Sequence, residues 1–134
     1  MPAVGGQRDE RERRDLRMEG AGRVKSRRFA VRVILLYREL CRGYREYELF
    51  RQLLRSGTSI GANIAEAECA MSSRDFVAKI YIALKECSET AYWLELLHET
   101  GYIADCDYNS LMDDCLELRR ILSATTKTIE AKLN

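Results

Sequence analysis

Hydrophobic residues recur at steps of three and four along most of the chain, which is the spacing of one face of an α-helix. The first such series starts at Phe29, and Ile34 and Tyr37 lie beside it. Gly43 follows as the glycine expected to end this helix in a left-handed conformation. The series consists of Phe29, Val33, Leu36 and Leu40.

A second series begins near Arg45, and polar side chains take over its apolar positions in the second half. Its members are Leu49, Leu53, Ser56, Ile60, Asn63 and Ala67. Ser72 followed by Asp75 then matches a capping box, in which a serine and an acidic side chain begin the next helix. Only a short turn separates the two series, so we expect the two helices to be antiparallel.

Two further series complete the pattern. The third comprises Phe76, Ile80, Ala83, Cys87, Thr90, Leu94 and Leu97. The fourth comprises Tyr108, Leu111, Cys115, Leu118, Leu122, Thr125 and Ile129. Gly101 is expected to close the third helix, and Asp105 or Asp107 to cap the fourth. Four amphipathic helices with short connections predict an all-α fold, an antiparallel up-down-up-down four-helix bundle.

The stretch from residue 55 to 67 is small and polar where its neighbours are large and apolar. Helical spacing puts one set of polar side chains on a single face, namely Ser56, Ser59, Asn63 and Glu66. Gly57 and Gly61, followed by Ala65, fall on an adjoining face, where they would let another backbone come close. Glycine inside a helix costs roughly 1 kcal/mol relative to alanine, so two of them predict a packing reason.

The polar face has two interpretations. In the first it is a buried hydrogen-bond network that fixes helix register, answered by Lys85, Glu86 or Glu89 of the third helix. In the second it is a recognition surface for a partner protein or RNA. The pair Tyr92-Trp93 similarly predicts a core or subunit-interface anchor, with a base-stacking platform as the alternative.

Composition fits one helical domain: 134 residues, 46% hydrophobic, 32% charged and a single proline. Residues 1–24 carry a dense run of mixed charge with few apolar residues, which predicts a flexible tail or a solvated helical extension. Residues 25–134 then form the bundle domain. No apolar run approaches the roughly 20 residues of a membrane span, and the N-terminus has no apolar signal-peptide core. We therefore expect a cytoplasmic protein without membrane association.

Charge is distributed unevenly between the two halves of the bundle. Residues 23–56 hold ten basic and three acidic side chains, a balance of +7, and residues 66–117 hold three basic and twelve acidic, a balance of −9. This asymmetry favours packing within the bundle or between copies of it. It also leaves a candidate face for nucleic acid or a partner, formed by Arg27, Arg28, Arg32, Arg51 and Arg55.

Residue types that carry chemistry are sparse. A di-iron bundle needs two Glu-x-x-His motifs, and Glu95-Leu-Leu-His98 is the only match, because His98 is the sole histidine. The number of cysteines, five, is odd, and none of them has Cys-x-x-Cys spacing, which argues against a disulfide framework or a metal site. Cys87 and Cys115 fall on the apolar series, as is typical of free thiols in a core. We expect no catalytic residues, cofactor, metal site or small-molecule substrate.

Several segments resemble a known bacterial family. Residues 55–66, which end in Ser59-Ile-Gly-Ala-Asn-Ile-Ala-Glu66, carry the resemblance together with Asp75-Phe76, residues 83–94 and Gly101-Tyr102. They resemble the bacterial four-helix bundle proteins first known from intervening sequences of 23S ribosomal RNA genes. The chain is similar also to the accessory variability protein of diversity-generating retroelements.

The resemblance implies a four-helix bundle that assembles into a homopentamer and has no catalytic residues. It implies a scaffold whose partner is itself, and, for the retroelement relatives, a basic accessory protein that binds a reverse transcriptase with its RNA or DNA. This chain departs from many members in having Gly61 in place of a proline and Ala67 in place of a glycine. The charge of residues 29–134 sums to −3, which argues against a strongly basic accessory protein.

Overall fold

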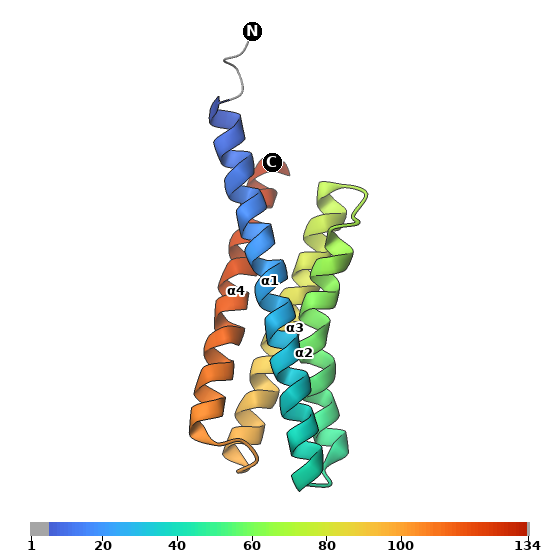
Figure 1. The fold of residues 1–134 in the computed structure, drawn as a ribbon. Coiled ribbons are helices and arrows are strands. Elements are labelled where there is room, and N and C mark those ends of the chain that lie inside the picture. The colour runs from blue at the N-terminus through green and yellow to red at the C-terminus, as the bar shows by residue number, and fades with distance from the viewer. Residues whose placement is uncertain (1–5, 134) are drawn as a thin grey trace.

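The computed structural model describes the backbone of residues 6–133 and the side chains of residues 20–133. Its four helices are α1 (Gly6–Gly43), α2 (Tyr47–Ala67), α3 (Ser73–Glu99) and α4 (Asp105–Leu133). Each helix packs on the two neighbouring ones in the order α1, α2, α3, α4 and back to α1, so α1 and α3 are diagonal to each other (Figure 1). The predicted antiparallel four-helix bundle is confirmed.

Local chemistry explains where α3 begins and ends. Ser72 Oγ accepts a hydrogen bond from the Asp75 amide at 3.1 Å, and Asp75 Oδ2 accepts one from the Met71 amide at 3.3 Å, which confirms the predicted cap. Gly101 has a φ of +85°, the left-handed conformation that favours glycine, and it follows α3 as predicted. The same prediction for Gly43 is wrong, because Gly101 is the only residue with positive φ in residues 6–133.

The core lies where the four apolar series meet. The series predicted for the third and fourth helices are buried over most of their length, from Ile80 to Leu97 and from Leu111 to Thr125. In α2 the prediction is wrong by one residue at two places, since Phe50 and Ile64 are buried and Leu49 and Asn63 are only half-buried. The spacing alone could not choose between adjacent positions 100° apart on the helix.

Helix α1 runs through the predicted domain boundary at residue 25. The backbone of residues 6–24 is helical, so this part of the charged segment extends the first helix; residues 1–5 lie outside the described chain. With 38 residues, α1 is about 57 Å long, against about 32 Å for the 21 residues of α2. Its N-terminal part therefore projects past the end of α2 and the α2–α3 turn (Figure 1).

Within residues 6–133 the helices are too short or too polar for any of them to cross a membrane.

Candidate interaction surfaces

The two glycines of α2 lie against α1. A Cβ atom placed on Gly57 would come within 2.9 Å of both Cγ atoms of Val33, and one on Gly61 would come within 3.3 Å of the Ser26 hydroxyl. Val33 and Ser26 are themselves buried. Both glycines thus lie close to the first helix of the same chain; Gly57 faces the Val33 side chain, and Gly61 faces both the side chain and the backbone carbonyl of Ser26.

The four polar residues of the same stretch do not form the predicted network with α3. Ser56, which is buried, donates to the carbonyl of Leu53, and Ser59 donates to that of Arg55 at 2.6 Å. Asn63 Nδ2 donates to the Ser59 carbonyl at 2.8 Å, again within α2. Among the four, Glu66 reaches α3, where its carboxylate lies 3.2 Å from Lys79. Short polar side chains bond readily to the preceding helical turn, and that competes with bonding between helices.

Arg55 provides the polar link to α3 instead. Its guanidinium lies 3.6 Å from Glu86 Oε1 and is hydrogen-bonded to Glu89. Burial raises the pKa of the Glu86 carboxyl, and the positive charge of Arg55 opposes that rise. Glu86 Oε2 is buried without a hydrogen-bond partner among the described residues. Arg55 therefore compensates a half-buried carboxylate.

The other four arginines of the candidate face differ in whether they have an acidic partner. Arg32 is engaged with α4, where it donates to Asp114 at 2.5 Å and to Ser110 at 2.9 Å. Arg27, Arg28 and Arg51 are exposed and make no ion pair within residues 20–133. Because Gly57 faces Val33, Arg51 lies roughly 15 Å along the bundle from Arg27 and Arg28. The structure does not bring the five together.

Helix α1 presents apolar side chains on the side that faces away from the core. Val24 is 46% exposed, Val31 51%, Ile34 41% and Leu35 51%, and we call these four the α1 stripe. The expectation that Ile34 packs beside the core series is wrong. Val24, Val31 and Leu35 follow one another at helical spacing on the side of α1 opposite the core. This spacing is the signal in the sequence from which the stripe could be predicted.

Helix α3 carries a second exposed set, Tyr81, Ile82 and Tyr92, which we call the α3 stripe; its members are 40%, 40% and 53% exposed. The Tyr81 hydroxyl donates to Glu130 of α4 at 2.7 Å. The Tyr92 ring packs edge-on against Trp93, with centroids 5.1 Å apart. Trp93 is half-buried against the core, so the predicted pair consists of one core-packed and one outward ring.

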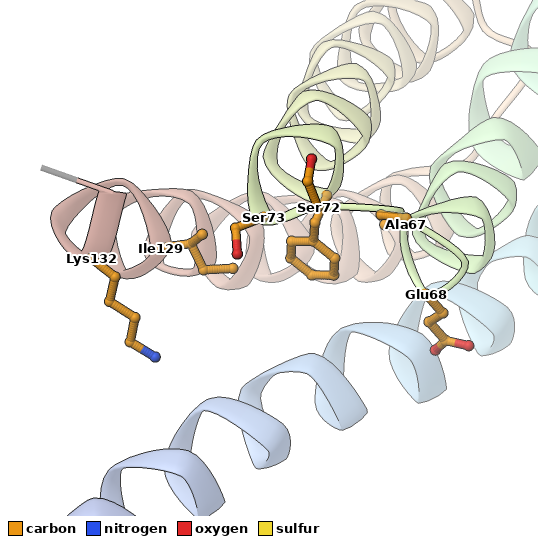
Figure 2. Close-up of a pocket in the computed structure, with 8 residues that line it drawn as sticks. Ala67, Glu68, Ser72, Ser73, Ile129 and Lys132 are labelled. Atoms are coloured by element: carbon orange, nitrogen blue, oxygen red, sulfur yellow. The ribbon is translucent and has the colours of Figure 1, made fainter.

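A cavity of about 440 Å³ opens where the α2–α3 turn meets α4 (Figure 2). Its walls combine apolar Ala67, Phe76 and Ile129 with Glu68 and Ser72. Glu68 already pairs with Arg23 at 3.1 Å, and Ser72 caps α3. Both Glu68 and Ser72 therefore already have a partner within the fold.

The buried cysteines and the histidine make contacts that hold the fold together. Cys87 and Cys115 are buried as predicted, and the Cys115 thiol donates to the Cys87 carbonyl at 3.3 Å. The hydrogen bond with Cys115 and burial raise the pKa of the Cys87 thiol. His98 is hydrogen-bonded to Asp105 at 2.7 Å and stacks on the Tyr108 ring. Residues 20–133 contain no cluster of three or more His, Cys, Asp or Glu that could hold a metal ion.

The fold and these surfaces define a class: a four-helix bundle whose outer faces carry apolar stripes and arginines. The model of the family described as 23S rRNA-intervening sequence protein matches residues 23–124, so the chain belongs to that family. The chain is also similar to a crystal structure from Bacteroides thetaiotaomicron, described as a protein with unknown function from the S23 ribosomal protein family.

That likeness is extensive. The two chains are 47% identical with a TM-score of 0.80, over 82% of this chain and 98% of the other. A search of curated proteins found no match.

Proposed function

We propose that the protein is a non-enzymatic helical scaffold that acts by associating with copies of itself, five in the assembled form. The observation that carries the proposal is the α1 stripe, in which Val24, Val31 and Leu35 share one exposed helix face that points away from the core. Single exposed apolar residues are ordinary, but several aligned on one helix face are typical of interaction sites. The number of copies follows from the resemblance to the bacterial four-helix bundle family.

The mass of the full chain in solution tests this proposal. Sedimentation velocity and native mass spectrometry should detect a discrete assembly that persists on dilution into the micromolar range. A chain that remains a monomer throughout that range would overturn the scaffold proposal. A discrete assembly of another size would retain the scaffold and replace the number five.

The second candidate is an accessory protein that binds nucleic acid, of the kind that partners a reverse transcriptase. Arg27 and Arg28 favour it, because they are exposed on α1 without an acidic partner among residues 20–133. Phosphate contacts release counterions, so the affinity would fall steeply as salt rises. Arg32 and Arg55 contribute little to such a face, since acidic side chains of α3 and α4 already engage them.

A binding titration with single-stranded RNA and DNA at several salt concentrations tests the second candidate. If it holds, the Arg27→Ala and Arg28→Ala double variant should bind more weakly and reduce the slope of log K against log salt by about 2. The control is Arg42→Ala, because Arg42 is paired with Glu39 on its own helix. Absence of binding by the unmodified chain at low salt would eliminate this candidate.

A further inference from the structure

We propose that Gly20 and Gly22 form a hinge in α1, at which the N-terminal arm of this helix bends toward the C-terminal end of α4. The arm consists of residues 6–19, whose backbone is helical. In the bent position it closes over the cavity beside the α2–α3 turn. The closing segment belongs to this chain, so the motion does not depend on how copies of the chain associate.

The surroundings of the two glycines are the first reason. Glycine destabilises a helix interior relative to alanine, so a glycine there needs a physical cause. At Gly57 and Gly61 the cause is close packing, since a Cβ would come within 2.9 and 3.3 Å of side-chain atoms of α1. A Cβ on Gly20 has nothing within 4 Å, and one on Gly22 would make an ordinary contact of 3.6 Å with Ile121. Packing therefore does not require these two glycines, whereas a bend would, because glycine leaves the helical conformation at little cost.

The bundle side of the hinge is held by contacts to both neighbouring helices. Arg23 donates to Glu68, directly after α2, at 3.1 Å. Lys25 forms an ion pair with Glu117 of α4. Ser26, the next residue, is buried. The packed part of α1 thus begins directly after the two glycines.

The arm lacks the apolar periodicity that attaches a helix to a bundle. Residues 6–19 contain five arginines and five acidic residues, and their only apolar residues, Leu16 and Met18, lie within four residues of Gly20. The match to the family model begins at residue 23, after the arm and the hinge. Figure 2 shows α1 and α4 separating toward the N-terminus of α1 and the C-terminus of α4. A hinge at the base of the arm would therefore let it move as one body.

The cavity of about 440 Å³ lies next to the hinge (Figure 2). Glu68, the partner of Arg23, lines it, and Gly22 lines a neighbouring hollow together with Glu68 and Phe76. Phe76 and Ile129, which form part of the cavity wall, are only half-buried. Bending at the glycines would bring the base of the arm over this apolar wall, and removal of apolar surface from water favours the closed position.

The distance between the arm and the α2–α3 turn tests the hinge. Cys69 is exposed on that turn and accepts one spin label, and Arg13→Cys provides the second site in the arm. Cys41→Ser and Cys106→Ser remove the other thiols that are not buried. Pulsed electron spin resonance on labelled chain, diluted in excess unlabelled chain, reports distances within one chain. We expect two populations, of which the shorter distance belongs to the closed arm.

The double variant Gly20→Ala and Gly22→Ala should lose most of the short-distance population. Each alanine favours the straight helix, and together they should lower the ratio of bent to straight arm by roughly thirtyfold. The variant should fold, because both Cβ atoms have room. Gly43→Ala is the matched control: its Cβ also has nothing within 4 Å, but it lies at the other end of α1 and should leave the distances unchanged.

Ile129→Glu tests where the arm closes. Closure would bury this carboxylate against the arm, so the short-distance population should fall several-fold. An unchanged population would contradict closure over the cavity.

Three results would overturn the hinge itself. The first is a single population at the distance of the straight arm in the unmodified chain. The second is an equal short-distance population in the unmodified chain and the double glycine variant, because the bend would then lie elsewhere. The third is one broad, continuous distribution in both, which would show an arm that unravels from its end.

Discussion

The Gly57→Leu variant is expected to lose about 2 kcal/mol of unfolding free energy. A Cβ at this position already meets both Cγ atoms of Val33 at 2.9 Å, and Val33 is fully buried, so it has no solvent to move into. Valine is stiff at χ1, and overpacking a core commonly costs about 1–3 kcal/mol. The gain from removing a helix glycine, roughly 1 kcal/mol, offsets only part of the strain.

Gly20→Ala is the control for Gly57→Leu, because a Cβ on Gly20 has nothing within 4 Å. This variant should be more stable than the unmodified chain by up to about 1 kcal/mol, since Gly20 lies inside α1. Denaturant unfolding at one fixed protein concentration measures both, because association adds to apparent stability. Equal stability of Gly57→Leu and the unmodified chain would show that α1 and α2 do not cross at this point.

Phe50→Ala is expected to have the larger effect, a loss of about 3–5 kcal/mol. The Phe50 side chain is completely buried, and its ring packs edge-on against Tyr102 and Tyr44 with centroids 5.3 and 6.3 Å apart. Removal of the ring leaves a cavity where α2 begins and deprives both tyrosines of their common contact. The variant should unfold at markedly lower denaturant concentration.

Leu49→Ala is the neighbouring comparison and should cost clearly less, because Leu49 is only half-buried. The periodicity of the sequence predicts the opposite order, since it places Leu49 on the apolar series. A larger loss for Leu49→Ala than for Phe50→Ala would mean that α2 is rotated relative to the arrangement described above.

The number and order of the helices could be predicted from the sequence, because the apolar spacing and the signals at the helix ends agree. Ser72 and Asp75 bond to backbone groups within four residues, and Gly101 acts through its own φ angle. The helix ends that they set could therefore be predicted from short stretches of sequence. The choice between Leu49 and Phe50 as the buried residue could not be predicted in this way, because it depends on how α2 is rotated against its neighbours α1 and α3. Gly43 shows the same limit, since a helix can end at a glycine without a left-handed residue.

The candidate surfaces were harder to predict. The sequence indicated Arg55 as part of a basic face, but its partners Glu86 and Glu89 lie more than thirty residues away and meet it only through the α2–α3 packing. The α1 stripe was missed because Val24, Val31 and Leu35 are interleaved with arginines that suggest a polar surface. Only the position of the core shows that these apolar side chains point away from it.

The glycine and serine stretch of α2 has an intramolecular role in this structure. Gly57 and Gly61 admit α1, and the serines and Asn63 bond within their own helix. The surfaces named above as candidates for partners, namely the stripes of α1 and α3 and the pair Arg27 and Arg28, lie outside residues 56–63. Conservative changes within residues 56–63 should therefore alter stability more than they alter binding.

The proposed self-association is tested best by the native mass of the 134-residue chain. We expect one discrete species of five 15.5 kDa chains at micromolar concentration. A species with the mass of a single chain under the same conditions would show that the protein does not self-associate.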